Sequence, residues 1–234
     1  VGDRGLVGGA PKATGFVAHF STTDSSGNEL SVPNFLDVPF PSDVYLVNGR
    51  YMDPIPGFDA VFAQNGGFLT HELAKTNGFS RIAASIFYVD DVGNVDRDGN
   101  IVSGKVAPSS LPRSEAECVS DTSSVYLIDL EQPDASKARI PCRALFHDDS
   151  FASDTRPMLA VAPARGILLE EGHRYAAVLT SRVKSESGQS LTASADFKKA
   201  IAGTGTLYAN AFASASAALG NALSSDVEIV SIAP

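Results

Sequence analysis

The sequence predicts a mainly β fold, with an antiparallel β-sandwich at its centre. From residue 79 onward, short segments rich in β-branched and aromatic residues alternate with Pro, Gly, Asp or Ser. No long helical pattern separates these segments, which argues against alternating strand–helix–strand units and a parallel sheet. The expected strands are residues 82–89, 124–130, 139–146, 158–163, 175–180 and 191–197.

Composition bounds the class of protein. The 234 residues are 44% hydrophobic and 19% charged, which is typical of a folded chain of one domain or one and a half. The formal net charge of −9 argues against nucleic acid and anionic membrane as partners, because both reward Lys and Arg. No window approaches 18 consecutive apolar residues, so no transmembrane segment is expected.

Two segments precede the predicted sandwich. Residues 1–33 are rich in Gly, Ser and Thr and are expected to form an extended arm with one strand at 15–20. Residues 34–80 form an anchoring segment, in which Pro39 and Pro41 prevent a helix and favour extended chain. Apolar residues at helical spacing then predict a short helix over 67–77, which ends at the Asn–Gly pair of positions 77 and 78.

The sandwich is expected to occupy residues 81–200 and to be followed by a terminal segment, 201–234. An alanine-rich stretch over 206–223 predicts a second peripheral helix, and residues 227–232 predict a terminal strand. The missing initiator Met and this apolar terminal strand suggest a processed or trimmed piece, with the strand leading to a following domain. The apolar stripe of the helix consists of Leu207, Phe212, Ala215 and Leu219.

The two cysteines, Cys118 and Cys142, lie on either side of the strand predicted at 124–130. An antiparallel pair of strands would bring them together, so a disulfide is the leading interpretation and two separate buried thiols are the alternative. A metal site is disfavoured because structural zinc needs four ligands. A disulfide would imply an oxidising compartment, that is, the periplasm, the cell surface or the medium.

Three stretches carry a resemblance to a known family. They are residues 34–43 with their Pro-Phe-Pro-Ser-Asp, residues 77–80 before a strand, and residues 168–180 with Gly188 and its neighbours after them. Together they resemble the bacterial Ig-like domain at the amino-terminal side of secreted and surface lipases of the virulence-factor type. The last stretch is also similar to Ig-like domains of S-layer and surface proteins. The resemblance implies an Ig-like β-sandwich in a bacterial extracellular setting.

Within that last stretch, Gly172 is expected to supply a turn between the two sheets. Tyr175 is expected to bury its ring and to bond its hydroxyl to the backbone. In the lipase-like relatives a hydrolase domain follows, and residues 227–234 resemble the point where it begins.

A loop at residues 94–101 resembles part of a calcium site. Oxygen-bearing side chains at alternate positions, with Gly99 between the last two, match the first two-thirds of an EF-hand-like loop. Lys105 stands where such a loop has its bidentate Glu, so an ordinary polar hairpin turn is the competing interpretation. The candidate calcium ligands are Asn94, Asp96, Asp98 and Asn100.

No constellation of catalytic residues is evident from the sequence. It lacks the Gly-x-Ser-x-Gly motif of serine hydrolases, and the four histidines, scattered without metal-site spacing, are read as surface or turn residues. The leading hypothesis is therefore a non-catalytic extracellular Ig-like surface module with a structural, assembly or binding role, whose partners are itself or other surface proteins. The alternatives are the accessory domain of a secreted esterase or lipase, and calcium-dependent binding of a glycan or matrix. The histidines are His19, His71, His147 and His173.

Overall fold

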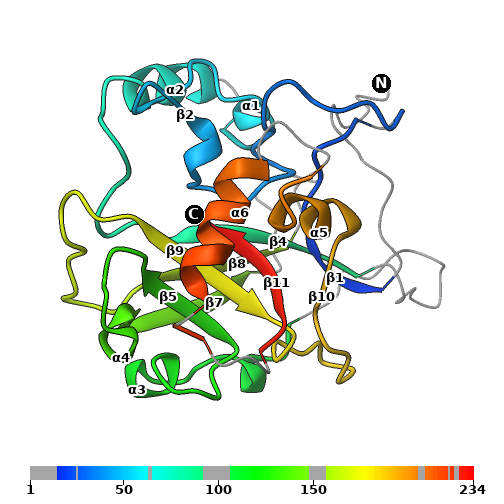
Figure 1. Ribbon diagram of the computed structural model, residues 1–234. Helices are drawn as coiled ribbons and strands as arrows, with labels where there is room; N and C mark the ends of the chain where they lie inside the picture. The colour runs from blue at the N-terminus through cyan, green and yellow to red at the C-terminus, as the bar shows by residue number, and fades with distance from the viewer. Residues whose placement is uncertain are drawn as a thin grey trace.

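The computed structural model describes residues 15–24, 26–62, 65–91, 106–147, 157–204, 209–220, 222–223 and 227–234. Within these ranges the chain is sheet-rich, with several antiparallel sheets and a few helices, which confirms the mainly β class (Figure 1). The strands are β1 (Phe16–His19), β2 (Leu46–Val47), β3 (Arg50–Tyr51), β4 (Ser85–Asp91), β5 (Val125–Asp129), β6 (Arg139–Ile140), β7 (Cys142–His147), β8 (Met158–Pro163), β9 (Tyr175–Thr180), β10 (Thr192–Ala193) and β11 (Ile229–Ala233). The α-helices are α1 (Phe58–Phe62), α2 (Gly66–Leu73), α3 (Glu115–Cys118), α4 (Ala135–Ala138), α5 (Ala195–Ile201) and α6 (Ala209–Leu219), and short 3-10 turns lie at Asp43–Tyr45 and Pro108–Ser110.

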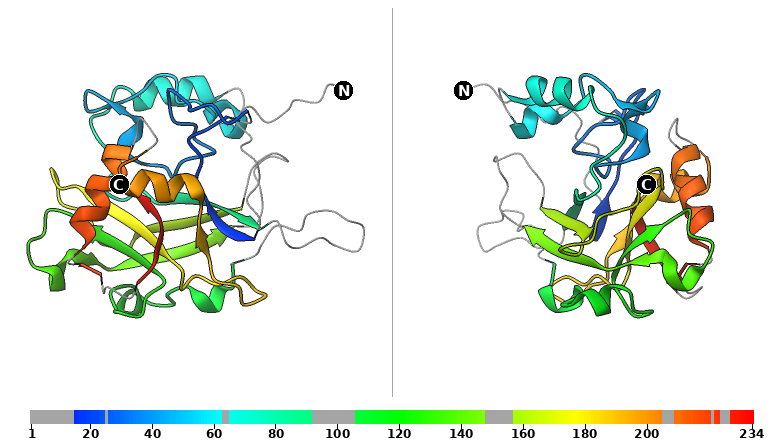
Figure 2. Two further views of the ribbon diagram at one scale, coloured as in Figure 1. Left: turned by 45° about the vertical axis from the view of Figure 1, so that its right-hand side comes forward. Right: turned by 90° about the vertical axis from the view of Figure 1, so that its left-hand side faces the viewer.

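Two larger sheets form the centre of the molecule. One has the strand order β10-β1-β4-β8-β7 and the other the order β11-β9-β5-β6. The pairings are antiparallel except that of β1 with β10, which is parallel and only two residues long. Strands β2 and β3 form a separate small hairpin beside helix α2 (Figure 1), in the part of the molecule that lies away from the two larger sheets (Figure 2).

The two larger sheets pack face to face over one apolar cluster. Alternate residues of β5 and β8, such as Val125, Leu127, Leu159 and Val161, point into it and are at most 4% exposed. The residues between them, such as Tyr126, face the opposite side and are buried there as well. Burial on both faces explains why these strands are continuous apolar runs in the sequence.

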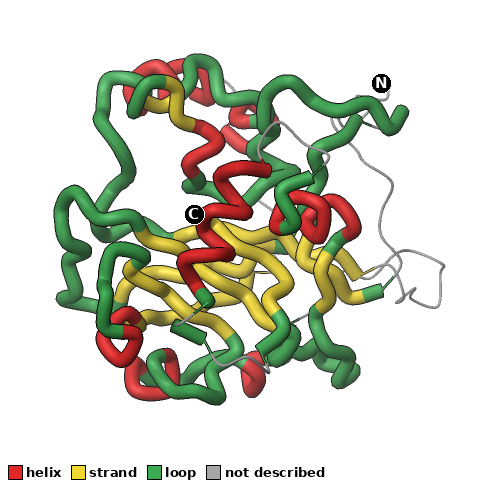
Figure 3. The backbone as a smooth tube through the Cα atoms, viewed as in Figure 1, coloured by secondary structure: helices red, strands yellow, loops and turns green. Residues whose placement is uncertain are grey.

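A second apolar cluster covers the outer faces of the sheets. Helices α5 and α6 contribute Phe197 and Phe212, whose rings contact Phe20 at centroid distances of 5.6 and 4.9 Å. Figure 3 shows these helices lying against the sheets. Because full burial of such a side chain stabilises a fold by about 1.5–3 kcal/mol, the helices belong to the core rather than to the periphery.

The helices differ from the sequence expectation in number and place. One or two peripheral helices were expected, whereas six α-helices lie within the described residues. The strand predicted at 191–197 is wrong beyond position 193, because the Ser194 hydroxyl accepts a hydrogen bond from the Phe197 N–H and begins α5. The stripe predicted for α6 is confirmed at Phe212, Ala215 and Leu219, and Leu207 lies outside the described residues.

The predicted disulfide between Cys118 and Cys142 is present. Its Cα atoms are 5.6 Å apart, and both residues are 1% exposed. Cys118 ends α3 and Cys142 begins β7, so the bond ties the connection before β5 to an edge strand of the opposite sheet. Because β5 pairs with β6 and not with β7, the bridge crosses between the sheets instead of joining neighbouring strands.

Among the described residues, no helix has both the length and the apolar character needed to cross a membrane.

Candidate functional site

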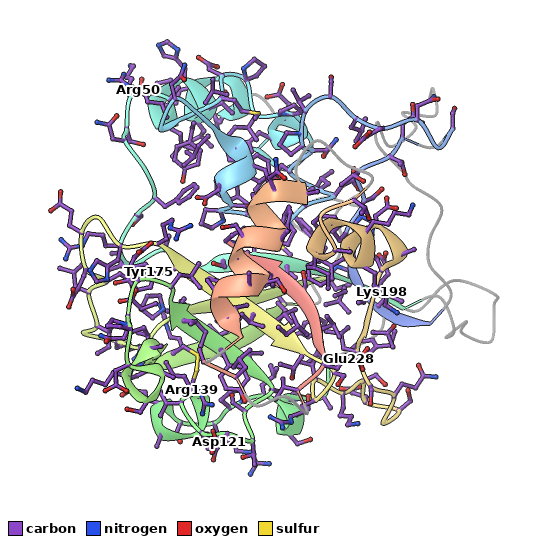
Figure 4. All side chains as sticks on the ribbon, viewed as in Figure 1. Arg50, Asp121, Arg139, Tyr175, Lys198 and Glu228 are labelled. Atoms are coloured by element: carbon purple, nitrogen blue, oxygen red, sulfur yellow. A yellow bond between two sulfur atoms is a disulfide. The ribbon has the colours of Figure 1, made fainter. Side chains whose placement is uncertain are left out.

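A cleft of about 610 Å³ opens where four distant segments of the chain, together with Leu127 of β5, meet. Residues 77–85 form one wall and residues 163–175 form another, and residues 41–46 and the end of β11 complete the lining. In Figure 4 the labelled Tyr175 marks its position. The lining residues are Pro41, Asp43, Leu46, Asn77, Gly78, Phe79, Ser80, Arg81, Ala83, Ser85, Leu127, Pro163, Leu169, Glu170, Glu171, Gly172, His173, Arg174, Tyr175, Ala177, Ala233 and Pro234.

Backbone hydrogen bonds join the walls of the cleft. The Leu169 N–H donates to the Arg81 carbonyl at 3.2 Å, and Arg81 Nε donates back to the Leu169 carbonyl. The Asp43 N–H donates to the Pro234 carbonyl at 3.0 Å, which fixes Asp43 beside the end of β11. Gly172 has φ of +77°, a conformation in which L side chains are strained, so glycine suits the expected turn.

His173 lies between two carboxylates at the rim of the cleft. Its Nδ1 lies 2.8 Å from Asp129 Oδ2, and its Nε2 lies 3.4 Å from Glu170 Oε2. The hydrogen bond with Asp129 is the main cause that raises the pKa of His173 above 6.5, and the charges of Asp129, Glu170 and Glu131 add to it. His173 is therefore held as a cation to a higher pH than an isolated imidazole.

Tyr175 connects this rim to the sheet. Its hydroxyl oxygen accepts a hydrogen bond from the Glu170 N–H at 2.9 Å, which confirms the expected bond between this hydroxyl and the backbone. Burial raises the pKa of Tyr175, and its ring stacks with that of His173 at a centroid distance of 6.2 Å. The loop 170–174 is thus fixed to the start of β9.

The remaining charged groups of the cleft differ in their contacts. Arg174 Nε lies 2.6 Å from Oε1 of Glu131, a residue that does not line the cleft. Asp43 is exposed, but partial burial of its carboxyl raises the pKa of this group, and the charge of Arg174 partly offsets the rise. This combination of apolar walls, aromatic rings and a few charges is typical of a ligand-binding site.

The histidines do not all lie at the surface. His71 and His173 do occupy a surface helix and a turn, but the expectation is wrong for His19, which is 5% exposed. Its Nε2 lies 2.9 Å from Asp37 Oδ1 and its Nδ1 lies 2.5 Å from Asp90 Oδ2, and both carboxylates are buried too. The partners are 18 and 71 residues away, so no local pattern in the sequence marks this cluster.

The calcium prediction falls outside the described residues. All four candidate ligands, Asn94, Asp96, Asp98 and Asn100, lie between positions 92 and 105, and calcium binding there stays a prediction. Asp90, in the strand that precedes this loop, contacts His19.

The cleft was only partly foreseeable. The stretches 34–43, 77–80 and 168–180 were singled out for a family resemblance, and all three contribute to the cleft, but nothing in the sequence indicated that they meet. Arg81 carried no signal of its own. Comparison of the chain with protein-family models, with curated proteins and with solved structures gave no match. The geometry of the cleft is therefore the basis for a functional proposal.

Proposed function

We propose that this chain is a non-catalytic extracellular surface module of Ig-like sandwich architecture that binds a ligand in the cleft. The face-to-face packing of two mostly antiparallel sheets supports the architecture. The buried Cys118–Cys142 disulfide supports an oxidising, extracellular setting, since such bonds persist there. The sequence resemblance to bacterial surface domains points to the same setting.

The proposal rests on one observation: hydrogen bonds within the fold fix the position of side chains that line the cleft. His173 is bonded to the buried Asp129, Tyr175 to the backbone of residue 170, and Arg174 to Glu131. A preformed cleft loses little conformational entropy when a ligand enters it. Both ring nitrogens of His173 lie against carboxylates, which fixes the imidazole at the rim of a binding cleft.

A substitution that fills the cleft tests this function. Ala83 is exposed and lines the cleft, so Ala83→Trp is expected to block it without disturbing the core. Ala116, exposed on α3 and outside the cleft, provides the matched control Ala116→Trp. The probes are a randomised nonapeptide library and a glycan array, applied to the wild type and to both variants.

We expect at least one probe to bind to the wild type and to Ala116→Trp but not to Ala83→Trp. It fails if no probe distinguishes Ala83→Trp from the wild type. It also fails if the purified chain hydrolyses p-nitrophenyl esters and Ala83→Trp removes that activity, because the cleft would then be an active site.

An assembly role would make a second copy of the chain the ligand. Sedimentation velocity over a concentration series measures this directly. Self-association that Ala83→Trp abolishes would support the cleft as the interface, and self-association that persists in Ala83→Trp would contradict it.

A second candidate is the amino-terminal accessory domain of a secreted esterase or lipase. It is favoured by the path of β11, because Ala233 and Pro234 line the cleft. In a longer polypeptide, the residues after position 234 would thus start at the cleft. The coding sequence beyond Pro234 tests this candidate: a Gly-x-Ser-x-Gly motif would support it, and an immediate stop codon would exclude it.

A further inference from the structure

Three carboxylates line the cleft, and two of them, Asp43 and Glu171, make no ion pair among the described residues. Among the residues that the structure describes, no cationic side chain lies within 4.0 Å of the carboxyl oxygens of Asp43 or Glu171, and both line the cleft. Asp43 is held in the wall by its N–H bond to Pro234; the residue is exposed, and partial burial of its carboxyl raises its pKa. A carboxylate in such surroundings gains more from an incoming cation than one in open water does.

The cations of the cleft, in contrast, already have acceptors. Arg174 contacts Glu131 at 2.6 Å, and His173 contacts Asp129 and Glu170. Arg81 donates from Nε to the Leu169 carbonyl. The bond of Arg81 to a neutral carbonyl leaves its charge in place, but the carboxylates are still in excess. With the partners Asp129 and Glu131 included, five carboxylates (Asp43, Asp129, Glu131, Glu170 and Glu171) stand against three cationic side chains (Arg81, Arg174 and His173).

Aromatic and apolar groups adjoin these carboxylates. The rings of Phe79 and Tyr175 line the cleft and supply apolar surface against which the aliphatic part of a basic side chain can pack. Beside the junction of Arg81 and Leu169, the side chains of Ile82 and Leu168 are 64% and 57% exposed. Neither residue lines the cleft itself, but each offers exposed aliphatic surface that an apolar residue of a bound partner can cover.

This combination selects the kind of ligand. A glycan would use the aromatic faces and carboxylates but would gain little from the aliphatic side chains of Ile82 and Leu168. A polypeptide segment uses both, because a basic side chain enters the cleft while its apolar neighbours cover the aliphatic pair. Charge complementarity with the acidic chain favours the same partner.

We infer that the cleft binds a lysine or arginine side chain from an extended segment of a partner polypeptide, with Asp43 as the principal counter-charge and Glu171 as the secondary one. This inference rests on the proposed binding function and adds the class of ligand. The partner's apolar residues on either side of the basic one lie on Ile82 and Leu168.

A positional peptide library tests the inference. The nonapeptides carry Lys, Arg, norleucine or Glu at the central position and randomised residues elsewhere, and the pools captured by the immobilised chain are quantified by mass spectrometry. We expect the Lys and Arg pools to exceed the norleucine pool by about tenfold, the value of one charge-assisted hydrogen bond. Asp43→Asn is expected to abolish this preference, and Glu171→Gln to reduce it.

Glu186→Gln is the matched control, because Glu186 is exposed and lies outside the cleft. It is expected to leave the preference unchanged, and thermal melting checks that each variant folds. Equal capture of the Lys and norleucine pools, or a Lys preference that survives Asp43→Asn, would overturn the inference.

The library and the cleft-filling variant separate the two proposals. If Glu-centred peptides or glycans bind and Ala83→Trp releases them, the binding function stands and the basic-ligand inference is wrong. If Ala83→Trp changes the capture of no probe, both are wrong.

Discussion

The imidazole of His19 joins two buried aspartates from opposite directions: its Nε2 lies 2.9 Å from Asp37 Oδ1, and its Nδ1 lies 2.5 Å from Asp90 Oδ2. His19 ends β1, Asp90 belongs to β4, and Asp37 lies in the anchoring segment 34–80. The three side chains are at most 7% exposed. The contact thus holds the anchoring segment against the five-stranded sheet.

Replacement of His19 by alanine is expected to lower the free energy of unfolding by about 3–5 kcal/mol, because each of two buried carboxylates loses its contact with the imidazole. Urea denaturation monitored by circular dichroism measures this loss. The exposed pair of His71 and Asp53, 3.0 Å apart, is the control, and His71→Ala is expected to cost less than about 1 kcal/mol. Similar losses for both variants would contradict a structural role for the buried cluster.

Removal of the disulfide is expected to destabilise the chain by about 3 kcal/mol, because the bond closes a loop of 24 residues in the unfolded state. The double variant Cys118→Ser/Cys142→Ser should unfold at lower urea than the wild type, and reductant should shift only the wild type. Intact mass and thiol titration of the unreduced protein provide the check. Two free thiols there would refute the bond.

The His173 imidazole is expected to titrate above 6.5, because Asp129 accepts a hydrogen bond from its protonated form. A folded-state pKa above the unfolded one means that protonation stabilises the fold. This contribution is fully present below pH 6.5 and is lost as the pH rises through the raised pKa. Asp129→Asn should return the pKa toward 6.5, and Glu170→Gln should change it less.

NMR titration of the His173 ring protons measures this pKa in the wild type and in both variants. A wild-type pKa at or below 6.5 would be inconsistent with the contact that fixes the rim of the cleft.

Helix α6 is expected to be essential for stability although it was predicted to be peripheral. Phe212→Ala should cost about 3–5 kcal/mol, because this fully buried ring packs against Phe20 at 4.9 Å. Phe68, which is 65% exposed on α2, offers the matched change Phe68→Ala with little expected loss. If chemical denaturation gave equal midpoints for the two variants, the integration of α6 into the core would be refuted.

The sequence predicted those elements whose signal is local. Strands β5, β8 and β9 are buried on both faces and read as continuous apolar runs, and the stripe of α6 repeats at helical spacing. Helix α5 was missed because it begins directly after the two-residue strand β10. The residues of the strand and the Ser194 cap are adjacent in sequence, and the whole segment was therefore interpreted as one strand. Short helices such as α3 and α4, of four residues each, are too brief for periodicity to show.

The candidate site shows the same limit. Gly172 and Tyr175 were recognisable because the turn and the following strand are contiguous in sequence. Asp43, Arg81 and Pro234 come together only through the packing of segments that lie far apart along the chain. A similar separation hides the contacts of His19 with Asp37 and Asp90, since each residue alone reads as an ordinary polar position.

Hydrogen exchange in the presence of the lysine-centred peptide pool tests the central claim most directly. The account predicts slower amide exchange in residues 77–85 and 163–175, the two walls of the cleft, for the wild type and not for Ala83→Trp. Unchanged exchange in both walls at a peptide concentration that saturates capture would contradict the cleft as the binding site.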